Sequence, residues 1–144
     1  MQQMRKLLEE VAHEIGIQKL PALGAMIETP AAALTVRQIA AQADFLSVGT
    51  NDLTQYTLVA GRDNTTVSDY YEETHESILR LLAMIIADAS GKPVTICGEL
   101  AGRSEIIPVL LEIGFRALSI APPLIPVTKE IIRSIDIGSQ RDQF

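Results

Sequence analysis

Four short apolar runs alternate with helical segments along this 144-residue chain, and this alternation restricts the fold more than any other feature. The runs span residues 23–27, 44–49, 94–97 and 115–120. Because strands that alternate with helices form parallel sheets covered by helices, the chain is predicted to be an α/β protein. The runs lack strict apolar–polar alternation, which predicts strands that are buried on both faces.

A helix with one apolar face is predicted before the first strand, over residues 2–16, because apolar residues recur there at steps of three and four. The other predicted helices span residues 30–42, 50 to about 59, 75–89, 104–113 and about 125–134. Their expected N-cap residues include Thr29, Thr74 and Ser104. The polar residues 61–73 are predicted to form a loop, and the polar tail from Asp136 is expected to fray.

Two architectures accommodate four strand–helix units. One is a small open doubly wound sheet, and the other is half of an eight-stranded barrel, since a complete barrel takes about 250 residues. Half a barrel leaves two sheet edges that something else must cover. In both architectures the functional residues lie at the carboxyl ends of the strands.

The composition restricts what such a domain binds and where it works. Lys and Arg number 12 against 18 Asp and Glu, and the net charge of −6 argues against nucleic acid, which requires a basic face. The apolar run 81–87 is far shorter than the roughly 18 residues that span a membrane. Cys97 is the only cysteine, so no internal disulfide forms, which predicts a cytoplasmic protein.

Polar residues at the ends of the predicted strands are the first candidates for a site. Glu28 follows the first strand, Asp52 lies three residues after the second, and Cys97 ends the third. Two carboxylates at adjacent strand ends suit Mg²⁺ or Mn²⁺. Spacing alone favours a simpler interpretation, in which the acids are helix-terminal residues favoured by the helix dipole and Cys97 is a small buried apolar residue.

Arg62 lies in the predicted polar loop, where its planar fork suits a phosphate. Without further context, a solvated loop arginine is the more common interpretation. His13 and His75 are the only histidines, and neither lies at motif spacing from a nucleophile or a ligand. The turn at residues 98–102 matches neither a Walker motif nor a dinucleotide-binding fingerprint.

Three segments resemble signatures of the phosphoenolpyruvate-utilising enzymes. They are residues 26–32 (MIETPAA), 47–56 (SVGTNDLTQY) and 96–102 (ICGELAG). Tyr56 and the run Arg62-Asp63-Asn64 look most like enzyme I of the sugar phosphotransferase system or its nitrogen-regulatory paralogue. Pyruvate phosphate dikinase and phosphoenolpyruvate synthase are more distant relatives. The resemblance covers about residues 20–135.

The resemblance implies both a fold and a site. The family barrel binds phosphoenolpyruvate and Mg²⁺, and this sequence is similar to its C-terminal half, so the whole chain is expected to be one partial barrel domain. By this resemblance Glu28 and Asp52 ligate Mg²⁺. Asn51, Asp52 and Arg62 bind the substrate, and Cys97 is the general acid that protonates the enolate to give pyruvate.

The reaction implied by the resemblance transfers phosphate from phosphoenolpyruvate to a histidine, as the first step of the phosphotransferase system. Arginines from the first barrel half, the phosphohistidine domain and the domain that binds the phosphocarrier protein are not in this sequence. The chain alone is therefore expected to lack turnover. Residues 71–77 also depart from the proline-bearing pattern of the family.

Other functions fit the same sequence. The family barrel is also a dimerisation domain, so a homodimer is expected, and an assembly module without catalysis is one alternative. A fragment of a dikinase-type or synthase-type enzyme is another. A small open-sheet domain of a metal-dependent aldolase or lyase acting on pyruvate is the third, which the segments 49–56 and 97–102 disfavour.

Overall fold

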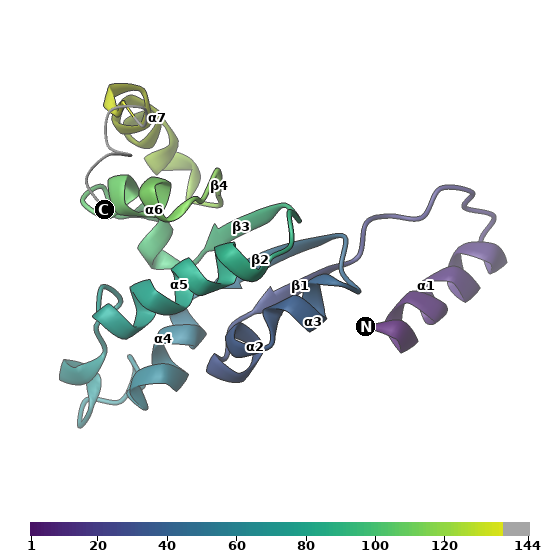
Figure 1. The fold of residues 1–144 in the computed structure, drawn as a ribbon, viewed down its shortest axis with the longest axis horizontal. Coiled ribbons are helices and arrows are strands. Elements are labelled where there is room, and N and C mark those ends of the chain that lie inside the picture. The colour runs from purple at the N-terminus through teal and green to yellow at the C-terminus, as the bar shows by residue number, and fades with distance from the viewer. Residues whose placement is uncertain (137–144) are drawn as a thin grey trace.

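The computed structural model describes residues 1–136, in which four parallel strands form one sheet (Figure 1). The strands are β1 (Gly24–Ile27), β2 (Phe45–Gly49), β3 (Val94–Cys97) and β4 (Ala117–Leu118). They lie side by side in chain order, as in a barrel, whereas a doubly wound sheet reverses its order at a switch point. The expected fold class is confirmed: α/β, with four parallel strands in the arrangement of half a barrel.

Helices and short turns connect the strands. The helices are α1 (Gln2–Glu14), α2 (Pro30–Leu34), α3 (Val36–Ala40), α4 (Thr50–Leu58), α5 (Glu76–Asp88), α6 (Ile107–Ile113) and α7 (Ile125–Ser134). Single 3₁₀ turns are η1 (Ser68–Tyr70), η2 (Glu99–Gly102) and η3 (Pro122–Leu124). In the described part of the chain, no helix combines the length and the apolar character that crossing a bilayer requires.

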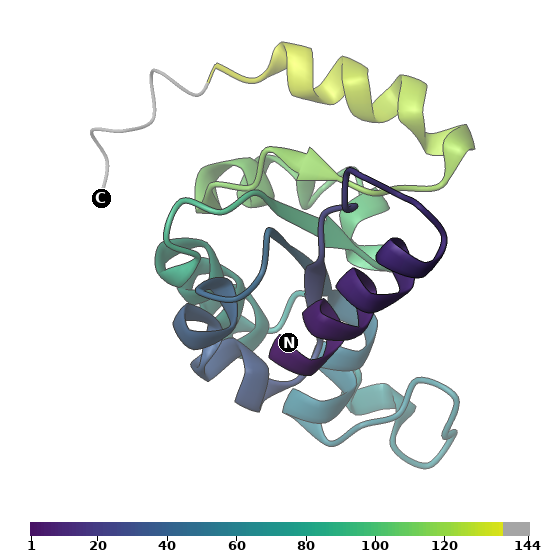
Figure 2. The same ribbon diagram turned by 90° about the vertical axis from the view of Figure 1, so that its right-hand side faces the viewer.

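The helices cover only one face of the sheet. Leu46, Val48 and Ile96 point to this face and are fully buried, and Figure 2 shows α2, α3, α5 and α6 gathered on one side of the strands. On the opposite face Met26 is 52% exposed and Phe45 is 38% exposed. The prediction of strands buried on both faces is therefore wrong, because nothing within residues 1–136 covers the face that lies inside a barrel.

The helix predicted over residues 30–42 is two helices. The chain turns at Thr35, where ψ is 20°, so that α2 ends at Leu34 and α3 begins at Val36. The expected start of α2 is confirmed, since the Thr29 hydroxyl accepts the Ala32 N–H at 3.2 Å.

Two other helix starts differ from the prediction. His75, not Thr74, caps α5, because its ring nitrogen accepts the Ser77 N–H at 3.2 Å. Ser104 caps no helix, since it lies in a turn and α6 begins only at Ile107. The fourth apolar run also forms only the two-residue strand β4. Most of the tail that is expected to fray, from residue 137 on, lies outside the described residues.

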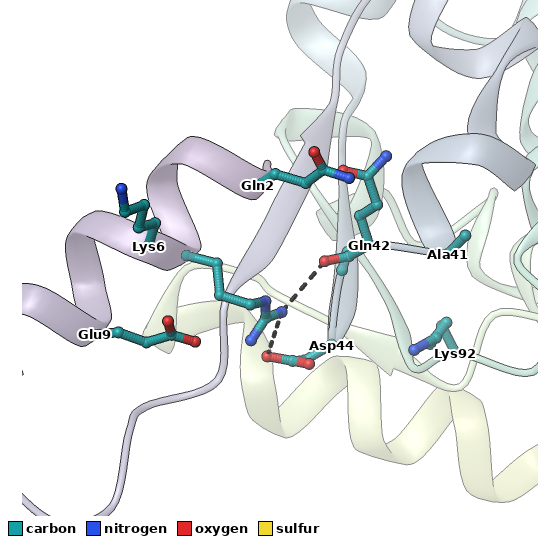
Figure 3. Close-up of a pocket in the computed structure, with 9 residues that line it drawn as sticks. Gln2, Lys6, Glu9, Ala41, Gln42, Asp44 and Lys92 are labelled. Atoms are coloured by element: carbon teal, nitrogen blue, oxygen red, sulfur yellow. Dashed lines mark hydrogen bonds and ion pairs between the residues drawn. The ribbon is translucent and has the colours of Figure 1, made fainter.

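Helix α1 is attached at the amino ends of the strands, opposite to α4 (Figure 1). The Arg5 guanidinium donates to the Gln42 carbonyl and to the Asp44 carboxylate, both at 3.2 Å, across the pocket drawn in Figure 3. Asp44 also accepts the Leu23 N–H at 2.7 Å, so one carboxylate joins α1, the chain before β1 and the start of β2.

These bonds make the stability of the chain depend on the charge of Asp44. The hydrogen bond from Leu23, and then that from Arg5, hold the pKa of Asp44 below its ordinary value of 3.8. A carboxyl group whose pKa is lowered by folding stabilises the fold above its ordinary pKa, and this contribution is lost as the pH falls through the folded value. We expect Asp44→Asn to lower the free energy of unfolding at pH 7, and the difference to shrink below pH 3.8.

Urea titrations of both proteins at neutral and acidic pH measure this difference. Glu10→Gln is the control, because it removes an exposed pair with Lys6 within α1, and such pairs contribute little. An effect of Asp44→Asn that is the same at both pH values contradicts the expectation.

Candidate active site

The carboxyl ends of β1, β2 and β3 meet at one edge of the sheet, because the strands are parallel and paired in register. Ile27 pairs with Val48, and Gly49 pairs with Cys97. Gly49 makes room for the side chain that follows β1, since a Cβ added there would lie 3.3 Å from Glu28 Oε2. The Glu28 carboxylate thus lies against the end of β2, where α4 begins.

Asp52 lies in the first turn of α4, and it is exposed, unlike its buried neighbours Thr50 and Leu53. Within residues 1–136, neither Glu28 nor Asp52 forms an ion pair. Their oxygens are of the kind that Mg²⁺ binds. The described residues include no group of three or more His, Cys, Asp or Glu side chains that could hold a metal. Two carboxylates still fit Mg²⁺, because this ion usually keeps several waters and takes further oxygens from its substrate.

Asn51 is fixed by the segment that follows β3. Its side-chain oxygen accepts the Glu99 N–H at 3.0 Å, and the neighbouring Thr50 hydroxyl donates to the Cys97 carbonyl at 2.9 Å. Gly98 permits this approach: its φ is +99°, and an added Cβ would lie 2.7 Å from Asn51 Oδ1 and closer still to Thr50 Oγ1. Two hydrogen bonds therefore connect the ends of β2 and β3, and the absence of a side chain at Gly98 makes them possible.

Cys97 is a free, half-buried cysteine at the end of β3. Its sulfur lies 3.5 Å from the Ser47 hydroxyl and 3.3 Å from the Val48 carbonyl. The residue lines a cavity of about 530 Å³, together with Asn51 and Ser119 among others. The thiol thus lies at the same edge as the carboxylates, beside a space that a small ligand could enter.

Arg62 reaches this edge from the loop after α4. Its guanidinium lies 2.9 Å from a Glu99 carboxylate oxygen, and its side chain is 43% exposed. The structure therefore brings Glu28, Asn51, Asp52, Arg62 and Cys97 to one end of the sheet.

Three further residues lie beside this site and were not predicted from the sequence: Tyr71, Glu73 and Arg103. The Tyr71 hydroxyl donates to the Asn51 carbonyl at 3.2 Å and lies 3.5 Å from the carboxylate of Glu73. Glu73 is in turn 3.6 Å from the Arg103 guanidinium. For Tyr71 and Glu73 the one available signal was the departure of residues 71–77 from the family pattern, and no sequence signal marked Arg103.

Burial dominates the acid–base behaviour of this group. Burial, followed by the charge of Glu99, raises the pKa of Glu73 above its ordinary value. Burial, followed by the charge of Glu73, raises the pKa of Tyr71 to about 12. The tyrosine is therefore a phenol at neutral pH, and it can donate the hydrogen bond to Asn51.

Gly98 is the most direct test of how the strand ends are held. We expect Gly98→Ala to lower the free energy of unfolding by about 1–3 kcal/mol, because its φ is strained for any other residue. We also expect it to remove the protection of the Glu99 amide from hydrogen exchange, since the new methyl group displaces Asn51. Gly91→Ala is the matched control: its φ is +75°, but nothing lies within 4 Å of the added Cβ. Equal effects of the two variants on the Glu99 amide contradict the account.

The sequence of the chain matches known proteins over most of its length. The family model described as "PEP-utilising enzyme, PEP-binding domain" matches residues 1–137. A relative named phosphoenolpyruvate-protein phosphotransferase, from Streptococcus equinus, is 42% identical over 122 residues, which cover 83% of this chain and 21% of the relative. One of the same name from Listeria monocytogenes is 45% identical over 117 residues, or 79% of this chain and 20% of the relative.

A third relative, from Escherichia coli K12, is named phosphoenolpyruvate-dependent phosphotransferase system and is 39% identical over 139 residues. These cover 92% of this chain and 19% of the relative. The chain thus spans about a fifth of the length of the curated relatives it matches. Because the family match extends over nearly the whole chain, the chain belongs to the phosphoenolpyruvate-utilising enzymes, within their phosphoenolpyruvate-binding domain.

Proposed function

We propose that the chain binds phosphoenolpyruvate with Mg²⁺ and forms part of the active site of a phosphoenolpyruvate–protein phosphotransferase. The enzyme would transfer phosphate from phosphoenolpyruvate to a histidine and release pyruvate. The observation that carries this proposal is the convergence of an acid, an amide, a second acid and a thiol at one strand edge: Glu28, Asn51, Asp52 and Cys97. The names of the relatives support the reaction class.

Glu28 and Asp52 are the residues that would hold Mg²⁺. Both lie at the same edge of the sheet and neither forms an ion pair within residues 1–136, so their oxygens are available. Bound there, Mg²⁺ would offset the negative charge of the phosphate and of the departing enolate.

Asn51 and Arg62 would hold the phosphate. The Glu99 N–H occupies the side-chain oxygen of Asn51, and this orients the amide so that its two N–H bonds remain available to donate. Arg62 is paired with the exposed Glu99 carboxylate, which a more highly charged phosphate can replace as its partner. The substrate would thus exchange one anionic partner of Arg62 for another.

Cys97 would act as the general acid. When the phosphoryl group leaves for the acceptor histidine, the enolate left behind needs a proton on its methylene carbon. The S–H bond of Cys97 breaks, the proton bonds to that carbon, and the sulfur keeps the electron pair as a thiolate. The half-buried position of the thiol beside the cavity suits this step.

In this proposal the acceptor histidine lies in another domain of the wider protein, and the phosphocarrier protein is a separate partner that such domains bind. His13 lies on α1, at the other end of the sheet, and His75 is engaged in capping α5.

We propose that the whole chain is part of one barrel domain and that the protein is cytoplasmic, as its single cysteine indicates.

A second candidate function is assembly without catalysis, in a homodimer. Two exposed apolar surfaces favour it: the uncovered sheet face with Met26 and Phe45, and a stripe along α1. The stripe consists of Met4, Leu7, Val11 and Ile15. Sedimentation that finds a stable monomer at micromolar concentration counts against this function.

Calorimetry on the purified chain tests the binding site. We expect phosphoenolpyruvate to bind only when Mg²⁺ is present, and Asp52→Asn to weaken binding at least about tenfold because it removes a charged ligand. Asp63→Asn, in the exposed loop, is the matched control and should bind as the unaltered chain does. An affinity for phosphoenolpyruvate that is the same with and without Mg²⁺, or that Asp52→Asn leaves unchanged, contradicts the proposed site.

A second experiment separates binding from turnover. Incubated with phosphoenolpyruvate and Mg²⁺, the chain should release pyruvate no faster than its Cys97→Ala variant, because neither of its histidines lies at the site. A coupled assay for pyruvate measures both rates. Pyruvate release that depends on Cys97 would show that this chain holds a complete catalytic site.

A further inference from the structure

A buried carboxylate outside the proposed site joins two segments that carry site residues. Glu73 is 7% exposed and is the only buried charged residue within residues 1–136. One of its oxygens lies 3.6 Å from the Arg103 guanidinium, and the other lies 3.5 Å from the Tyr71 hydroxyl. Arg103 follows η2, whereas Tyr71 and Glu73 end the long loop after α4.

These contacts lead directly to the proposed phosphate-binding residues. The Tyr71 hydroxyl donates to the main-chain carbonyl of Asn51 at 3.2 Å, so one side chain separates Glu73 from the backbone that carries the Asn51 amide. The loop that ends at Glu73 also carries Arg62. On the other side, Arg103 lines the cavity that Asn51 and Cys97 also line. Glu73 therefore lies where the loop with Arg62 meets the segment after β3.

The buried charge costs stability. Arg103 favours the ionised form of Glu73, but burial and the nearby Glu99 outweigh it, and the pKa of Glu73 is raised as a result. An imperfectly paired buried charge is less favourable than a neutral side chain of the same shape. Fold stability therefore does not explain why residue 73 carries a carboxylate. The contacts of Glu73 with the two site segments do explain it.

We infer that Glu73 is a positioning residue, which acts through Tyr71 and Arg103 to hold Asn51 and the Arg62 loop in the arrangement that accepts a phosphate. The identification of that phosphate as part of phosphoenolpyruvate rests on the proposed function. The role of Glu73 in ordering the two segments does not depend on the proposed function.

Glu73→Gln tests the inference, because it keeps the shape of the side chain and an acceptor for Tyr71 but loses the charge that faces Arg103. We expect its free energy of unfolding at pH 7 to be equal to or above that of the unaltered chain. We expect hydrogen exchange at the Glu99 amide and across residues 62–73 to become several times faster. Affinity for phosphoenolpyruvate in the presence of Mg²⁺ should fall about tenfold, as the loss of a charged hydrogen bond implies.

Two further variants complete the test. Glu72→Gln changes the adjacent, exposed glutamate and should leave all three measurements unchanged. Arg103→Gln removes the other partner from a half-exposed position, and it should speed exchange in the same segments even if Glu73→Gln fails to fold.

The outcomes separate three accounts. Exchange rates unchanged in both Glu73→Gln and Arg103→Gln overturn the inference. Faster exchange in Glu73→Gln that is matched by a loss of stability of that variant also overturns it, because Glu73 would then be a purely structural residue. If the unaltered chain does not bind phosphoenolpyruvate, the proposed function fails, and the exchange and stability measurements still decide the role of Glu73.

Discussion

The chain depends on burying one face of a parallel sheet. Leu46, Val48 and Ile96 alternate along β2 and β3 with residues that point the other way, and only the first set is packed under helices. This one-sided burial leaves the second face open. Because the strands are parallel and paired in register, the carboxyl ends of three of them lie at one edge, where the candidate site residues gather.

Two glycines let the strand ends approach each other closely. Gly49 leaves room for the Glu28 side chain, and Gly98 lets the segment after β3 contact Thr50 and Asn51. The amide of Asn51 is thereby oriented before any ligand binds, because the Glu99 N–H already occupies its oxygen. Such preorganisation matters for phosphoryl transfer, which relies mainly on positioning and on neutralising charge.

Sequence patterns predicted the parts of the fold that follow from local rules. The order of strands and helices and the Thr29 cap are of this kind, since each depends on neighbouring residues. The open face of the sheet could not be predicted, because a strand of four or five residues is too short for its pattern to tell whether a second layer covers it. The split at Thr35 was missed because residues 31–42 contain no glycine or proline that would mark it. The cap at His75 was missed because the neighbouring Thr74 is a more common capping residue.

The residues of the site likewise fall into those that local sequence patterns predict and those that depend on the tertiary structure. The acids and the cysteine at or near the strand ends could be placed at one edge from the strand order alone, and the family resemblance supplied their expected roles. Glu73 and Arg103 lie 30 residues apart in the sequence and meet only because of the path of the loop after α4. Local sequence patterns do not predict the path of this loop, so they could not predict the contact.

The proposed function requires Glu28 and Asp52 to bind one metal ion together with phosphoenolpyruvate at this edge of the sheet. Crystals of the chain grown with phosphoenolpyruvate and Mn²⁺, whose anomalous scattering identifies it, test this requirement. We expect one strong anomalous peak within about 2.0–2.3 Å of an oxygen of each carboxylate, with the phosphate beside Asn51. Ligand bound with the metal elsewhere, or with no metal between the two acids, would contradict it.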